Sequence, residues 1–185
     1  YDAFIRYDFG SSWMTNQNVM EPLRIRLPYP LLIGALSVLF SILVGIPLGI
    51  LAATNQYTWK DSLAIFSSLF CVSMPQFWFA LMLVMIFSVN LGLLPPWGIK
   101  SWTGYILPIV STSVGAVANI SRQTRSGMLE VIRQDYITTA RAKGAKARNV
   151  IYRHALRNAT NPITTVIGGI VAGVLGGTMV SDQIF

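Results

Sequence analysis

The sequence predicts an all-α, polytopic membrane protein, and three observations point to this fold class. The 185 residues are 53% apolar and 11% charged, whereas soluble domains carry about 25% charged residues. The charged side chains leave four uncharged runs, at residues 27–59, 62–99, 101–121 and 158–181. Each run can hold the roughly 20 residues of helix that cross a bilayer core about 30 Å thick. Finally, the net charge of +7 is concentrated in one stretch of the chain.

That basic stretch predicts the orientation in the membrane. Residues 122–157 hold nine basic and two acidic side chains, so their net charge, 9 − 2 = +7, equals that of the whole chain. Positively charged loops stay on the cytoplasmic side during insertion. We therefore expect a cytoplasmic loop at 122–161 and an external segment at 1–30, ahead of a transmembrane domain at 31–185.

The two ends suggest that further spans flank this sequence. The chain begins with Tyr1 and has no recognisable signal peptide. An external amino-terminal segment then implies a preceding span, and residues 181–185 should emerge outside and lead to another. The single cysteine, Cys71, excludes a disulfide scaffold.

The first two predicted spans each contain a proline. The first covers residues 31–53, and we expect Pro47 to kink it, which membrane helices tolerate. The second covers residues 62–89 and contains Pro75. The sequence leaves open whether this second run is one kinked helix or two helices.

The third predicted span, residues 105–121, carries several polar side chains. Ser111, Thr112 and Asn119 are candidates for the wall of a substrate path, because polar groups at membrane depth face other helices or water. Ordinary hydrogen bonding between helices explains them equally well.

The fourth predicted span, residues 163–181, spaces Gly169, Gly173 and Gly177 four residues apart. Small residues at this spacing allow two helix backbones to approach closely. We therefore predict a helix-packing face, whose neighbour could lie in the same chain or in another subunit.

Charged side chains are absent from all four predicted spans. Proton- and sodium-coupled carriers usually place ionisable groups at membrane depth. Those classes are therefore disfavoured, and an energy source outside the membrane is favoured.

The basic loop contains signals for a short helix. Asp135 is a good N-cap and Gly144 a good C′ residue, with Arg141 and Lys143 in the last turn, where cations favour the helix dipole. A helix of about two turns is marginal alone. We expect it to dock in a groove of a partner that has an acidic rim.

The chain resembles the permeases of ABC transporters, specifically the first permease of the dipeptide, oligopeptide and nickel branch. The resemblance extends over nearly the whole chain. Its motifs are Arg26-Leu27-Pro28, Gly45-Ile46-Pro47-Leu48-Gly49, Ser73-Met74-Pro75, Arg122-Gln123-Thr124-Arg125-Ser126-Gly127-Met128-Leu129-Glu130, Gln134-Asp135-Tyr136, Thr139-Ala140-Arg141-Ala142-Lys143-Gly144 and Arg153-His154-Ala155-Leu156-Arg157.

The resemblance implies the transmembrane domain of a type I ABC importer, with a cytoplasmic coupling helix at about 137–144. In the broader superfamily pattern Glu-Ala-Ala, three residues, Gly, the glutamate position is Thr138 here and the first alanine is Thr139. Ala140 and Gly144 match the pattern. The residues expected to couple the chain to an ATPase are Asp135, Thr138, Thr139, Ala140, Arg141, Ala142, Lys143 and Gly144.

The same resemblance implies the partners. They are a second homologous permease subunit, two ATP-binding subunits, an extracytoplasmic substrate-binding protein and the bilayer of the cell membrane, and no nucleic acid. This chain contains no Gly-x-x-x-x-Gly-Lys-Ser/Thr loop. ATP and Mg²⁺ are therefore expected in the partner ATPase, with no cofactor bound and no enzymatic activity in this chain.

Peptides are the expected substrate, and two other functions remain open. One is import of nickel or a metal chelate, because those carriers share the permease motifs. The other is a channel or secondary carrier that does not depend on nucleotide. The chain itself offers no metal site, since His154 is its single histidine. The basic loop could also bind anionic lipid or nucleic acid, a less favoured interpretation.

Overall fold

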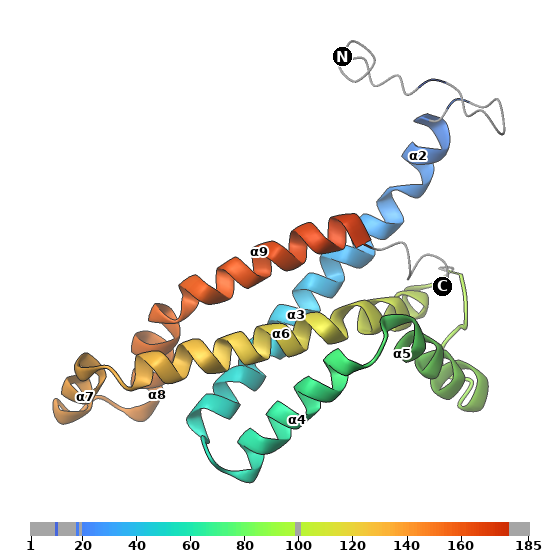
Figure 1. Ribbon diagram of the computed structural model, residues 1–185. Helices are drawn as coiled ribbons and strands as arrows, with labels where there is room; N and C mark the ends of the chain where they lie inside the picture. The colour runs from blue at the N-terminus through green and yellow to red at the C-terminus, as the bar shows by residue number, and fades with distance from the viewer. Residues whose placement is uncertain (1–9, 11–17, 19, 99–100, 178–185) are drawn as a thin grey trace.

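A computed structural model describes residues 10, 18, 20–98 and 101–177, and these fold mainly as helices. The all-α prediction is confirmed. α2 (Met20–Arg26) leads into α3 (Pro28–Thr54), and the other long helix, α6 (Ile106–Ile132), follows a 3₁₀ turn, η2 (Trp102–Tyr105). Figure 1 shows α3 and α6 lying along each other in the middle of the bundle.

Two stretches of helix among the described residues are long and apolar enough to cross a membrane. They are Arg24–Thr54 and Trp102–Ile132. Pro47 lies inside α3 without ending it. The first stretch begins ahead of the predicted span at 31–53, inside the segment predicted to be external.

The second predicted span is two helices that meet at a sharp bend. α4 (Trp59–Ser73) is followed by α5 (Gln76–Leu83) and a π-helical continuation, η1 (Val84–Asn90). The two halves are bent by 102° at the break, and counting them as one span raises the number of spans to three. Pro75 causes the break, because its ring disfavours helical backbone at Met74 and Pro75 has no N–H to donate. Both residues are extended.

The helix α6 extends well past Ser121, where the sequence predicts the cytoplasmic loop to begin. It continues to Ile132, and Gly127 and Met128 in its last turns are buried. The first charged residue therefore does not mark the end of the helix. Apolar residues continue at helical spacing beyond it and pack against α3 and α9.

The basic end of the bundle is built from short elements. These are α7 (Asp135–Ala142), α8 (Ala147–Asn149) and a π-helical segment, η3 (Val150–Leu156). α9 (Thr160–Gly177) then returns along α6 in the opposite direction (Figure 1). The predicted fourth span began at 163, and its last residues, 178–181, lie outside the described part of the chain.

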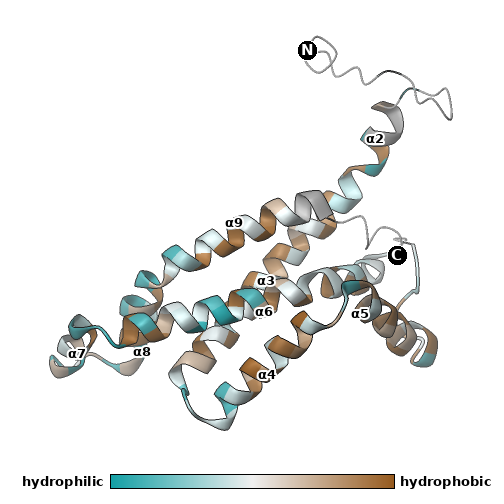
Figure 2. Ribbon diagram, in the orientation of Figure 1, coloured by the Kyte–Doolittle hydropathy of each residue, from teal (hydrophilic) through white to brown (hydrophobic). Residues whose placement is uncertain are grey.

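The outer surface is apolar over much of its length. In Figure 2 hydrophobic residues colour much of α3, α4 and α5, whereas hydrophilic residues gather around α7 and α8. Large side chains such as Leu43, Phe66 and Phe77 are more than half exposed. Apolar surface of this extent fits contact with lipid.

Small residues allow α3 and α6 to pack closely. Ser37, Ser41, Gly45 and Gly49 recur every four residues along α3, and all four are buried. A Cβ atom added to Gly49 would lie 2.5 Å from Thr124 Cβ and 2.6 Å from the Ser121 carbonyl oxygen. The Ser41 hydroxyl donates to the Ser37 carbonyl oxygen at 2.6 Å. The small-residue stripe on α3 therefore forms the principal helix contact of the molecule.

Candidate functional site

The predicted coupling residues all lie on one short element, α7 and the turn that ends it. Gln134 is the N-cap, with an extended backbone, and Asp135 is the first helical residue, so the helix begins one residue earlier than an Asp135 N-cap predicted. The Asp135 carboxylate lies in the first turn, where negative charge favours the helix dipole. Thr139 donates its hydroxyl to the Asp135 carbonyl oxygen at 3.0 Å.

The carboxyl end of α7 is a Schellman turn centred on Gly144. Gly144 has φ +80°, and its N–H donates to the Arg141 carbonyl oxygen at 2.9 Å. The Ala145 N–H donates to the Ala140 carbonyl oxygen at 3.1 Å. These two bonds define the motif, and glycine is favoured because it adopts positive φ without strain. The turn expected at Gly144 is therefore present.

Two side chains hold α7 against the described part of the molecule: the Tyr136 hydroxyl accepts from Asn158 Nδ2 at 3.0 Å, and Ile137 enters the core. Ile137 is fully buried, in a cluster contributed by five elements. The buried members of this basic-end core are Ile50, Ala53, Met128, Ile137, Val150, Ala155, Ala159 and Ile163. A helix this short is unstable in isolation, so the contact that orders it is made within its own chain.

The remaining face of α7 is exposed and cationic. Ala140 is half-buried, whereas Thr138, Thr139, Arg141, Ala142 and Lys143 are exposed. Lys146 and Arg148, which follow the turn, are exposed as well. Asp135, at the start of α7, is exposed too, so the positive charge gathers around the turn at Gly144, where it suits a complementary acidic surface.

Substituting Ile137 by alanine should detach α7 without unfolding the bundle. Loss of a fully buried isoleucine costs about 2–5 kcal/mol, and here the loss falls on the contact that orders an eight-residue helix. We expect amide hydrogen exchange in α7 to accelerate strongly while exchange in α3 stays slow. Thr138→Ala, which alters the exposed neighbour, is the matched control. Equal protection of α7 in both variants would contradict this role.

The predicted substrate-path residues differ in burial. Ser111 is buried, and its hydroxyl donates to the Pro108 carbonyl oxygen at 3.0 Å. Thr112 is half-buried, whereas Asn119 is exposed and lines a cavity between α6 and α9. Ser111 therefore fits the alternative of ordinary hydrogen bonding within the bundle, and Asn119 lines a cavity; the substrate-path role of these residues stays a prediction.

Gly168, Gly169 and Gly173 of α9 have no close neighbour in the described part of the chain. Cβ atoms added to Gly169 and Gly173 would meet no atom within 4 Å, and the side-chain environment of position 177 lies outside the description. Among the described residues, close packing of small residues is found on α3. An association of this face of α9 with another subunit stays a prediction.

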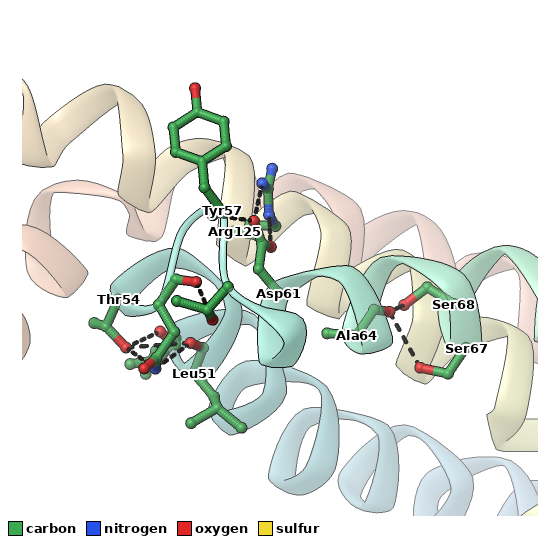
Figure 3. Close-up of polar contacts among 11 residues, drawn as sticks. Leu51, Thr54, Tyr57, Asp61, Ala64, Ser67, Ser68 and Arg125 are labelled. Atoms are coloured by element: carbon green, nitrogen blue, oxygen red, sulfur yellow. Dashed lines mark hydrogen bonds and ion pairs between the residues drawn. The ribbon is translucent and has the colours of Figure 1, made fainter.

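An ion pair that the sequence analysis missed joins the two sides of the basic end. Asp61 is buried and accepts from Arg125 Nε at 2.6 Å and from Arg125 Nη2 at 2.8 Å. The Tyr57 N–H donates to the same carboxylate at 3.2 Å. Figure 3 shows Asp61 pointing from the start of α4 toward Arg125 on α6. The loop between α3 and α4 is thereby fixed to α6.

The described residues contain no group of three or more His, Cys, Asp or Glu side chains that could hold a metal ion. The candidate site among the described residues is the exposed face of α7 with the turn at Gly144. A helical bundle with long apolar helices, an apolar outer surface and one basic end defines an integral membrane protein.

The family follows from comparison with known proteins. Residues 45–185 match the family described as the binding-protein-dependent transport system inner membrane component, and the chain belongs to that family. It is therefore an inner-membrane transport component.

Individual relatives are similar over nearly the whole chain. The oligopeptide transport system permease protein AppB of Bacillus subtilis is 38% identical over 192 residues, covering 98% of this chain and 61% of that protein. The dipeptide transport system permease protein DppB of Alkalihalophilus pseudofirmus is 38% identical over 206 residues, covering 96% and 62%. The glutathione transport system permease protein GsiC of Salmonella typhimurium is 36% identical over 178 residues, covering 96% and 58%. The chain spans about three-fifths of the length of these curated relatives.

Proposed function

We propose that this chain is part of the membrane-spanning permease of an ATP-driven ABC importer that carries peptides into the cell. The basic end of the bundle faces the cytoplasm, following the bias of positively charged loops toward that side. The observation that carries the proposal is α7: an exposed cationic helix, anchored by Ile137 and ended by the Gly144 turn, in a chain of this family.

In this proposal α7 is the coupling helix. A separate ATPase subunit binds its exposed face, with Arg141 and Lys143 contacting acidic groups and Ala140 allowing close packing. ATP and Mg²⁺ are held by that partner. Closure of a pair of ATPase subunits moves α7, and the basic-end core passes the movement to α3, α6 and α9.

The other partners are a second homologous permease subunit and an extracytoplasmic binding protein that delivers the solute. The peptide and glutathione names of the relatives favour a peptide substrate over nickel or a metal chelate. A nucleotide-independent channel or carrier is disfavoured, because the family is defined by binding-protein-dependent transport.

The Gly144 turn offers a direct test of coupling. Valine in a left-handed conformation is strained by about 1–2 kcal/mol or more, so Gly144→Val should distort the end of α7. We expect the full-length protein carrying it to lose most of its association with the ATPase subunit and most ATP-dependent peptide uptake in reconstituted vesicles.

Gly92→Val is the matched control. Gly92 also has positive φ, +62°, and open space around its Cβ position, but it follows η1, far along the chain from α7. It should suffer the same backbone strain and retain the ATPase. Equal loss in both variants would assign the effect to general destabilisation, and full uptake by Gly144→Val would overturn the assignment of α7.

A further inference from the structure

A polar cleft opens between α6 and α9, on a different face of α6 from the one that packs on α3. Its volume is about 470 Å³, within the range of small-molecule sites. The α6 residues that line it recur at three- and four-residue steps and so share one helix face. The lining residues are Asn119, Arg122, Gln123 and Ser126 from α6, and Val166, Gly169 and Ile170 from α9.

Arg122 gives this cleft a positive charge that no lining carboxylate balances. Its Nη2 donates to Asn119 Oδ1 at 2.6 Å, which orients the guanidinium but does not neutralise it. Within the described residues, no carboxylate oxygen lies within ion-pairing distance of Arg122. Arg125, one turn further along α6, differs because it is paired with Asp61.

The cleft lies beside α9 near the basic end of the bundle. α9 begins at Thr160, so at 1.5 Å per residue Val166 and Ile170 lie about 9 and 15 Å from its start. Arg122 is exposed and lies one turn from Arg125, the partner of Asp61. α9 offers Arg122 no charged partner in the cleft, because Val166 and Ile170 belong to the uncharged run 158–181.

We propose that this cleft is a solute subsite in which Arg122 binds a carboxylate of the transported peptide. The inference rests on the proposed function and names the part of the permease that contacts the solute. A guanidinium forms paired, charge-assisted hydrogen bonds with a carboxylate. Gln123 and Ser126 supply further hydrogen-bonding groups at the same face, and Gly169 leaves room for the solute against α9.

The role of the Arg122 charge in peptide binding is tested in the full-length protein, reconstituted with its partner subunits. The probe is labelled dialanine or trialanine, whichever the wild type transports faster. We expect Arg122→Gln to raise the peptide concentration for half-maximal uptake at least about tenfold, and Arg122→Lys to raise it less, because a single ammonium keeps the charge but not the paired geometry. Arg26→Gln, at an exposed arginine of α2, is the control and should match the wild type.

The need for open space in the cleft is tested separately, by substitution of Gly169. Leucine there should fill the cleft and block uptake, whereas Gly168→Leu should not, because Gly168 is equally exposed with open space around it but does not line the cleft. Equal loss in both variants would overturn the subsite and indicate instead that this face of α9 contacts another subunit.

The remaining outcomes separate the subsite from its alternatives. A defect of Arg122→Gln that occurs in vesicles containing phosphatidylglycerol and vanishes in phosphatidylcholine would assign the residue to lipid phosphate and overturn the proposal. Unchanged uptake by Arg122→Gln, with uptake lost in Gly144→Val, would overturn the subsite and leave the proposed function standing. Absence of peptide uptake by the wild-type complex would overturn both.

Discussion

Replacing Gly49 by alanine is expected to disrupt the contact between α3 and α6. The added methyl group would lie 2.5 Å from Thr124 Cβ and 2.6 Å from the backbone oxygen of Ser121. Backbone cannot move aside as a flexible side chain can, so the helices must separate. Overpacking typically costs about 1–3 kcal/mol, and we expect the upper end of this range or more. Thermal unfolding of the detergent-solubilised protein measures the loss.

Two control variants isolate the steric cause. Gly115→Ala adds the same methyl group to α6 where no atom lies within 4 Å, and it should be neutral or slightly stabilising because alanine favours helix. Thr124→Val keeps the shape of the side chain facing Gly49 and removes a buried hydroxyl that has no hydrogen-bond partner among the described residues. That variant should be no less stable than the wild type. An unfolding midpoint for Gly49→Ala equal to that of Gly115→Ala would refute the close contact.

Breaking the ion pair between Asp61 and Arg125 is expected to destabilise the protein asymmetrically. Removing one partner of a buried pair costs about 3–5 kcal/mol, because the other charge stays buried without compensation. The Asp61 side chain is 5% exposed and that of Arg125 is 23% exposed. Arg125→Ala therefore strands the more buried charge and should cost more than Asp61→Ala, whose arginine can reach water.

The double variant Asp61→Ala with Arg125→Ala completes the measurement. It strands no charge, so we expect its loss of unfolding free energy to be smaller than the sum of the two single losses. Asp61→Asn serves as a second control, since an amide oxygen can still accept from the Tyr57 N–H. If the two single losses of unfolding free energy add up to the loss of the double variant, the interaction between Asp61 and Arg125 contributes nothing to stability.

The elements that the sequence predicted are those defined by local signals. The apolar runs of α3 and α6 are long, and neither contains a Gly-Pro pair that would end a helix. Gly144 is a glycine at the position where a helix-ending turn was predicted. The bend at Pro75 could not be decided from the sequence, because proline in a membrane helix permits either a kink or a break. The choice depends on how α4 and α5 pack against α6.

The packing faces show where sequence reasoning was incomplete. Ser37, Ser41, Gly45 and Gly49 are spaced four residues apart in the sequence, yet no packing face was predicted from them. Gly169 and Gly173 of α9 have the same spacing, and a Cβ atom added to either would meet no described atom within 4 Å. Spacing alone shows that a face permits close contact, and a partner helix decides whether the contact forms.

The charged residues of α6 illustrate a second limit. Ending the third span at Ser121 assigned Arg122 and Arg125 to a loop, because the boundary was set by the first charge. Helix geometry instead places one arginine in a cleft beside α9 and the other against Asp61. The neighbours of both arginines come from distant parts of the chain. The α9 residues beside Arg122 are more than 40 residues away from it, and Asp61 is 64 residues away from Arg125.

The burial of Ile137 in a cluster shared by α3, α6, η3 and α9 has a mechanical consequence. Interiors packed this closely resist compression and transmit displacement. A displacement of α7 is therefore transmitted to α3, α6 and α9 together, because Ile137 packs directly in the core that they share. The ion pair between Asp61 and Arg125 joins α4 to the same packed core. The basic end of the bundle should therefore move as one rigid body.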